Sequence, residues 1–206
     1  MELVKTYSSK NIISESLKTA LTYKEYTQLI NDLVAIEASS GINATPDLVA
    51  YTKLNQKRMA RWDKTVKISE DIQQRINAFN GKVTWLVLTE SWCGDAAHVL
   101  PFMNKIAELN PNINLQLVFR DEHPELMDQF LTNGAKSIPK LIMIDNLKNE
   151  VVNTFGPRPT IATEMVENFK ATHGKLTDEF KAELQAWYNR DKGENTIADL
   201  IDLLGV

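Results

Sequence analysis

Residues 89–96 read TESWCGDA and contain Cys93, the only cysteine among the 206 residues. The segment follows a strongly apolar run and opens a stretch with helical spacing. Backbone N–H groups and the dipole at the start of a helix favour a thiolate there. A thiolate attacks disulfides, persulfides and sulfenic acids. Cys93 is therefore the candidate catalytic residue.

Charged residues around this thiol are expected to act in opposite directions. Asp95 lies two residues after Cys93, and its carboxylate repels a thiolate and raises the pKa of the thiol. Arg120, Lys140 and Arg158 are candidates for lowering that pKa, although each is equally well explained as a solvated surface charge. Arg120 qualifies because the ends of neighbouring parallel strands meet at one sheet edge. We expect a moderately activated thiolate.

Other chemistries have little support in the sequence. His98 comes five residues after Cys93, about 140° around a helix, so a Cys–His pair is not expected. One cysteine and scattered histidines do not form a metal-ligand cluster, and no glycine-rich phosphate loop is present. We therefore predict no metal and no cofactor. The structural alternative for Cys93 itself is a small buried residue without chemistry.

The elements that must position Cys93 are those of an α/β fold. Residues 83–88 form a near-continuous apolar run, typical of a buried parallel strand. The pattern that follows predicts a helix at residues 95–109, a strand at 112–119 and a short helix at 124–131. The first strand, the helix and the second strand together make a βαβ unit. Two further strands, joined by a turn, are predicted at residues 141–144 and 151–155. Three helices are then predicted at residues 161–170, 178–189 and 197–204. The sheet should thus contain parallel and antiparallel strands.

The residues before this unit read as helices. A capping box at Thr22 and Glu25 predicts a helix to about Ala38, Thr45 and Pro46 begin another, and Ser69 begins a third. The second helix has a basic face, which we interpret as solvated, formed by Lys53, Lys57, Arg58 and Arg61. We expect a helical extension over residues 1–81, the main domain over 82–172, and C-terminal helices packed on it over 173–206. The extension could cap a sheet edge, bind a partner or form a dimer.

Several features, taken in order, resemble the thioredoxin-like superfamily. Trp92-Cys93-Gly94 follows the central strand, Pro101 comes eight residues after the cysteine, residues 137–141 read SIPKL, and Gly156 follows the last strand. Residues 83–169 resemble a thioredoxin fold, and the whole resembles single-cysteine (WCGDA) thioredoxin family proteins of uncharacterised bacterial type. The resemblance implies a cis peptide bond before the proline of SIPKL. It also implies a substrate groove formed by Trp92, Gly94, Asp95, Ile138, Pro139 and Gly156.

The departures from that family decide the expected chemistry. Ala96 stands where a dithiol enzyme carries its second cysteine, and Val87 stands where thioredoxins carry a buried aspartate. We therefore predict no dithiol reductase activity. Two interpretations stay open: monothiol thiol–disulfide exchange by Cys93, resolved by a small thiol or another protein, and a non-catalytic module that binds a protein or peptide. Whether the chain is an enzyme is left open with them.

Composition limits the partners and the compartment. A net charge of −4 disfavours a nucleic-acid or anionic-membrane partner, so we expect a protein or a small thiol or disulfide instead. No apolar run approaches the ~20 residues that cross a bilayer, and the N-terminus lacks a signal-peptide core. With a single cysteine, these features predict a cytoplasmic protein.

Overall fold

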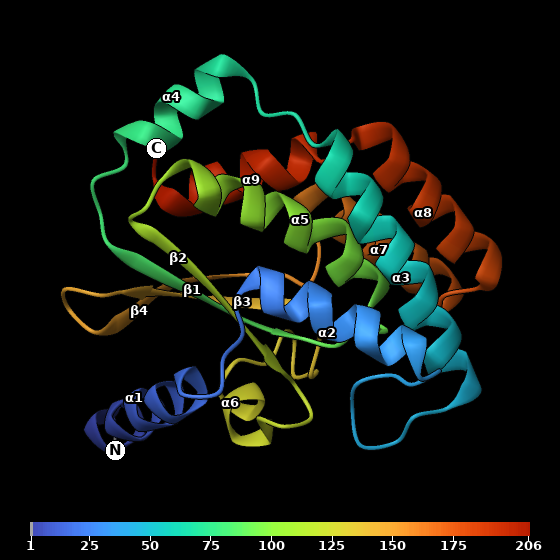
Figure 1. Ribbon diagram of the computed structural model, residues 1–206, viewed down its shortest axis with the longest axis horizontal. Coiled ribbons are helices and arrows are strands. Elements are labelled where there is room, and N and C mark those ends of the chain that lie inside the picture. The colour runs from blue at the N-terminus through green and yellow to red at the C-terminus, as the bar shows by residue number, and fades with distance from the viewer. Residues whose placement is uncertain (1) are drawn as a thin grey trace.

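The computed structural model describes residues 2–206, with side chains described from Ser9 onward, and confirms the predicted α/β class (Figure 1). Its four-stranded sheet has the order β2-β1-β3-β4. The strands are β1 (Val83–Thr89), β2 (Ile113–Phe119), β3 (Lys140–Asp145) and β4 (Glu150–Phe155). β1 runs parallel to β2 and antiparallel to β3, and β4 runs antiparallel to β3. The predicted mixture of strand directions is thus present.

Helices cover both faces of this sheet. Their bounds are α1 (Glu2–Leu17), α2 (Tyr23–Ala35), α3 (Pro46–Thr65), α4 (Glu70–Ala78), α5 (Gly94–Leu109), α6 (Pro124–Gln129), α7 (Thr160–His173), α8 (Asp178–Asp191) and α9 (Glu194–Leu204). α1 and α6 lie on one side of the sheet, and α3, α5, α8 and α9 lie on the other (Figure 1). Among the described residues, none of these helices is long and apolar enough to cross a membrane.

Local sequence signals account for most helix starts. Thr22 and Glu25 form the predicted capping box, and the Thr45 and Ser69 side chains cap α3 and α4. α2 ends at Ala35 rather than near Ala38, because Glu37 adopts a positive φ that no helix continues. α1 was not predicted as a separate helix, since its apolar residues do not gather on one face.

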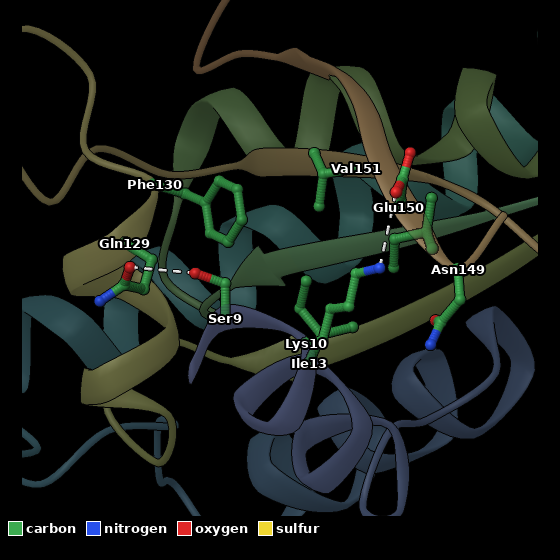
Figure 2. Close-up of a pocket in the computed structure, with 9 residues that line it drawn as sticks. Ser9, Lys10, Ile13, Gln129, Phe130, Asn149, Glu150 and Val151 are labelled. Carbon is green, nitrogen blue, oxygen red and sulfur yellow. Dashed lines mark hydrogen bonds and ion pairs between the residues drawn. The ribbon is translucent and has the colours of Figure 1, made fainter. Parts of the chain in front are cut away.

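The N-terminal segment covers an edge of the sheet, one of the three roles considered for it. Leu21 exchanges two backbone hydrogen bonds of 2.8 Å with Leu117 of β2, on the side away from β1. Pairing of this kind removes an open strand edge. On the same side of the sheet as α1, a cavity of about 310 Å³ lies between α1, α6 and the β3–β4 hairpin, where Lys10 reaches Glu150 at 3.6 Å (Figure 2).

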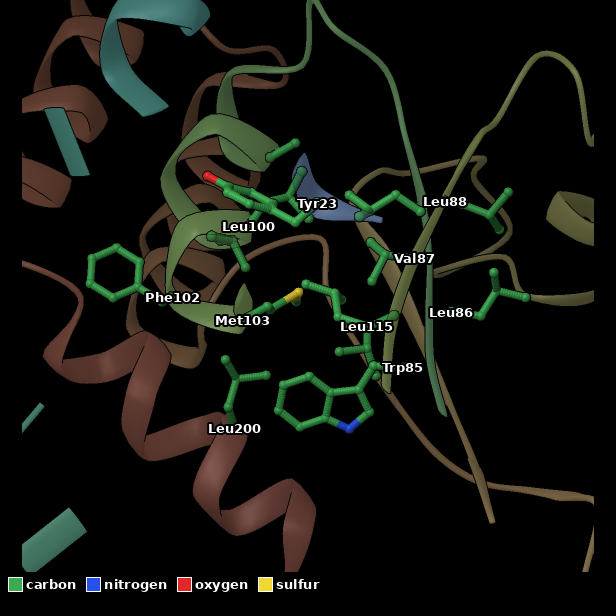
Figure 3. Packing of buried hydrophobic residues seen from close by; sticks show 14 of the residues in the cluster. Tyr23, Trp85, Leu86, Val87, Leu88, Leu100, Phe102, Met103, Leu115 and Leu200 are labelled. Atoms are coloured by element: carbon green, nitrogen blue, oxygen red, sulfur yellow. The ribbon is translucent and has the colours of Figure 1, made fainter. Parts of the chain in front are cut away.

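The core is centred on β1, whose residues are all buried. Leu100 and Met103 of α5 and Leu200 of α9 belong to this core, and Met103 and Leu200 lie beside Trp85 of β1 (Figure 3). The same cluster contains buried side chains of α1, α2, α3 and α4, so the N-terminal helices share the core of the sheet. Trp62 and Trp85 are buried, whereas Trp187 is only partly buried in a smaller cluster between α7 and α8.

Candidate functional site: the groove beside Cys93

Cys93 is the N-cap of α5, directly beyond the end of β1. Its Sγ accepts a hydrogen bond from the Ala96 N–H at 3.5 Å, and its thiol donates to the Ile138 carbonyl oxygen at 3.3 Å. Only 7% of the residue is exposed. The Ile138–Pro139 peptide bond is cis. The thiol and the SIPKL segment therefore face each other.

The prediction that Cys93 is an activated thiolate is wrong for this structure. Burial first, and then the carboxylate of Asp95, raise the pKa of Cys93 to about 12. The backbone N–H groups of Ala96 and Asp95 and the charge of Arg158 lower the pKa, but their combined effect is smaller. The sequence showed the helix start and Asp95, but it did not show how completely the thiol is covered. Cys93 is a protonated thiol in this structure.

Asp95 is held between two partners from the C-terminal part of the chain. Arg158 forms an ion pair with its Oδ2 at 2.6 Å, and the Tyr188 hydroxyl donates to its Oδ1 at 3.0 Å. Burial raises the pKa of Asp95, while Arg158 and Tyr188 lower it. Tyr188 comes from α8, so a helix near the C-terminal end of the chain helps to position a residue next to the thiol.

His98 belongs to the core and does not pair with Cys93. Its Nδ1 accepts a hydrogen bond from the Trp62 indole N–H at 3.0 Å, so Nε2 carries the proton and donates to Gln185 at 2.9 Å. The imidazole stacks on Tyr188 with ring centroids 4.3 Å apart. Burial lowers the pKa of His98 to about 4. His98 thus supports Tyr188, which in turn holds Asp95.

A loop of the N-terminal extension fixes the residues just before Cys93. The Ser40 hydroxyl bonds to the fully buried carboxyl of Glu90, and the Ser40 carbonyl accepts from the Trp92 indole N–H at 3.2 Å. Ser91 accepts from the Ser40 N–H at 2.9 Å, and its carbonyl accepts from Asn55 of α3 at 3.0 Å. These bonds lock the strand-to-helix turn that carries the thiol.

A groove of about 490 Å³ opens beside Cys93. It is lined by Leu48, Tyr51, Trp92, Cys93, Gly94, Asp95, Arg120, Lys136, Ser137, Ile138, Pro157, Arg158 and Lys170. Two of the residues predicted to bind substrate, Pro139 and Gly156, are not among them. They contact each other instead, and a Cβ at Gly156, where φ is +109°, would overlap the Pro139 carbonyl oxygen. Glycine is therefore required there to support the cis-proline segment.

The three basic residues predicted to tune the thiol have different surroundings. Arg158 lowers the pKa of Cys93. Arg120 stands over the Trp92 ring at 5.0 Å and pairs with Asp121 at 2.8 Å, so it forms part of the groove wall. Lys140 is buried on β3 and donates to the Thr132 hydroxyl at 3.3 Å, which leaves it outside the lining of the groove.

Sequence reasoning missed several residues of this site. Leu48 and Tyr51 of α3, Lys136, and Lys170 of α7 line the groove. Arg58, which we interpreted as part of a solvated face, is half-buried, and its Nη1 would lie 3.5 Å from a Cβ at Gly94. The only available signal was the basic face of α3, and nothing in the chain indicated that one of its residues turns toward Cys93. Among the described residues, no His, Cys, Asp and Glu side chains cluster as metal ligands.

Comparison with known proteins agrees with this fold. A family model described as thioredoxin matches residues 41–171, well over half of the chain, and the chain therefore belongs to this thioredoxin family. The match includes α3 and α4 as well as the sheet. No curated protein matches the chain.

Two solved structures share the fold. One is a protein of unknown function, PA1234 from Pseudomonas aeruginosa, with 18% identity, a TM-score of 0.57, and coverage of 90% of this chain and 98% of the other. The second is an HIV epitope-scaffold, with 18% identity, a TM-score of 0.56, and coverage of 85% and 96%. At this level of identity the likeness concerns the fold alone.

Proposed function

We propose that this member of the thioredoxin family is a binding protein, and that its ligand occupies the groove beside Cys93. The observation that carries the proposal is the bond from the Cys93 thiol to the Ile138 carbonyl at 3.3 Å. That bond uses the sulfur as a proton donor, and a nucleophilic sulfur must be deprotonated. Ala96 and Val87, in place of the second cysteine and the aspartate, agree with a site that does not exchange disulfides.

Monothiol exchange is the second candidate, favoured by the Ala96 N–H that points at Sγ from the first turn of α5. In that reaction the Cys93 thiolate attacks a disulfide R–S–S–R′, a Cys93–S–S–R bond forms, and R′–S⁻ leaves. A second thiol R–SH then attacks the mixed disulfide, releases R–S–S–R and restores Cys93. In the first step the Cys93 sulfur goes from oxidation state −2 to −1 while the departing R′ sulfur goes from −1 to −2, and the second step returns Cys93 to the thiolate.

A comparison of wild-type protein with the Cys93→Ser variant separates the two candidates. Reduction of bis(2-hydroxyethyl) disulfide is followed in the presence of glutathione, and intact mass detects any mixed disulfide. The binding function predicts equal background rates for both proteins and no adduct at pH 7. A wild-type rate well above that of Cys93→Ser, together with an adduct on Cys93, establishes monothiol exchange instead.

Three further expectations, on location, origin and domain division, accompany this proposal. We propose a cytoplasmic location and a bacterial origin, on the basis of the single cysteine and of the family resemblance. We also retain the division into residues 1–81, 82–172 and 173–206. Limited proteolysis tests the division, because cleavage confined to the segments near residues 81 and 172 supports boundaries there. Fragments that unfold together after a cut argue for one cooperative unit.

A further inference from the structure

The groove beside Cys93 concentrates positive charge on a protein of net charge −4. Four cationic side chains line it, Arg120, Lys136, Arg158 and Lys170, and Asp95 is the one acidic side chain of its lining. These cations come from four separate parts of the fold: the end of β2, the segment before β3, the turn after β4, and α7. A cluster assembled from distant segments on an acidic protein creates a local field that attracts anions.

The cations differ in how fully they are already paired. Arg158 is bound to Asp95 at 2.6 Å, Arg120 to Asp121 at 2.8 Å, and Lys136 to Asp128 at 2.6 Å. Asp121 and Asp128 lie outside the lining, so the charge of their partners still faces the groove. Within the part of the chain that the structure describes, Lys170 has no acidic side chain within ion-pair distance. An anion entering the groove thus meets one ammonium group that has no competing carboxylate.

The rest of the groove is apolar and partly exposed. Leu48 and Tyr51 from α3, Trp92 and Ile138 contribute to its walls, and Tyr51 is 45% exposed. Covering exposed aromatic surface of this kind with a flat apolar group is energetically favourable. A volume of about 490 Å³ is within the range that holds a small organic molecule.

We propose that the ligand of this groove is a small organic anion, with a carboxylate or phosphate group among Arg120, Lys136 and Lys170 and an apolar body against Leu48, Tyr51 and Trp92. This inference rests on the proposed binding function and names its ligand class. An extended peptide that paired with Ile138 would have to share its carbonyl with the Cys93 thiol, which already donates to it.

Two matched probes test the charge and the apolar part separately. 2-Naphthoate and its neutral isostere 2-naphthamide are titrated into the full chain at low salt, with pyrophosphate as the phosphate probe. Binding is measured by calorimetry and by the shift of the Trp92 indole N–H resonance. The proposal predicts that 2-naphthoate binds, that 2-naphthamide binds at least tenfold more weakly, and that raising NaCl from 50 mM to 500 mM weakens the naphthoate complex. If pyrophosphate binds as well as 2-naphthoate, the groove accepts phosphate groups. If 2-naphthoate binds and pyrophosphate does not, the groove is specific for carboxylates.

Variants connect the binding to the named cations. Lys170→Gln and Lys136→Gln are each expected to weaken 2-naphthoate binding by about three- to tenfold. Lys82→Gln is the matched control, since Lys82 is exposed at the opposite end of β1 and should leave binding unchanged. Equal binding of both naphthalene probes, or equal loss in the Lys82→Gln protein, overturns the anion inference while a binding function survives. Absence of any probe binding also overturns it, whereas disulfide exchange that depends on Cys93 refutes the binding function independently.

Discussion

Replacing Asp95 with asparagine should make Cys93 more reactive. The carboxylate of Asp95 is the charge that raises the pKa of the thiol most, after burial itself. Asparagine keeps an oxygen that can accept from the Tyr188 hydroxyl, which now donates to Asp95 at 3.0 Å. It also frees Arg158, whose positive charge favours the thiolate, from its ion pair. Both effects have the same sign, so the pKa of Cys93 should fall.

The size of the effect follows from two opposing factors. Removing a like charge at close range lowers a neighbouring pKa by about 1–3. At a pH well below the pKa, the thiolate fraction then rises by about 10- to 1000-fold. A less basic thiolate is also a weaker nucleophile, with a Brønsted coefficient of about 0.4–0.5, which cancels nearly half of that gain on a logarithmic scale. The expected increase in alkylation rate is therefore about 3- to 60-fold.

The assay is alkylation of Cys93 by excess iodoacetamide at pH 8, followed by intact mass. Glu108→Gln is the control, because Glu108 is exposed near the far end of α5 and should not change the rate. Thermal unfolding of each protein checks that the native fold is intact under the assay conditions. An Asp95→Asn protein that reacts at the wild-type rate or more slowly refutes the electrostatic account of the site.

Three further predictions concern the structure that supports the groove. The pKa of His98 is about 4, below its ordinary value near 6.5, so the unfolded chain binds more protons than the folded chain between these pH values. The free energy of unfolding should therefore fall by up to about 3 kcal/mol as the pH drops from 6.5 to 4. Urea unfolding should show a smaller fall in the His98→Gln protein. Burial raises the pKa of Glu90, so the wild-type protein should lose stability relative to Glu90→Gln as the pH rises from 4.5 to 7.5, and an opposite trend contradicts the assignment. Gly156→Ala should cost about 3 kcal/mol or more because of overlap with the Pro139 carbonyl, against about 1–2 kcal/mol for Gly174→Ala, where φ is also positive but no atom is near; equal costs in chemical denaturation would show that the overlap is relieved without strain.

Much of the fold could be predicted because its signals are local. The apolar run that became β1 needed only its own residues to be recognised, and the caps at Thr22, Thr45 and Ser69 fixed three helix starts within one turn. The position of Cys93 between β1 and α5 followed from the same signals. α1 had no such signal, since its residues show no apolar face and its place depends on contacts with α6 and β4.

The state of the thiol could not be predicted, because it depends on contacts between distant segments. The Cys93 thiol is hydrogen-bonded to Ile138, forty-five residues later in the chain. Asp95 accepts a hydrogen bond from Tyr188, ninety-three residues later. Sequence spacing identified Asp95 and Arg158 as opposing charges, but the balance depends on burial, which only the packed structure defines. The groove wall formed by α3 and α7 was missed for the same reason.

The most direct test of the central claim is the pH dependence of Cys93 alkylation in the ligand-free protein, with Cys93→Ser as the blank. A buried, protonated thiol predicts a slow rate at pH 7 that keeps rising beyond pH 10 without a plateau. A plateau with an apparent pKa well below the ~8.5 of a free thiol would contradict the binding function. It would restore Cys93 as the nucleophile of a monothiol exchange.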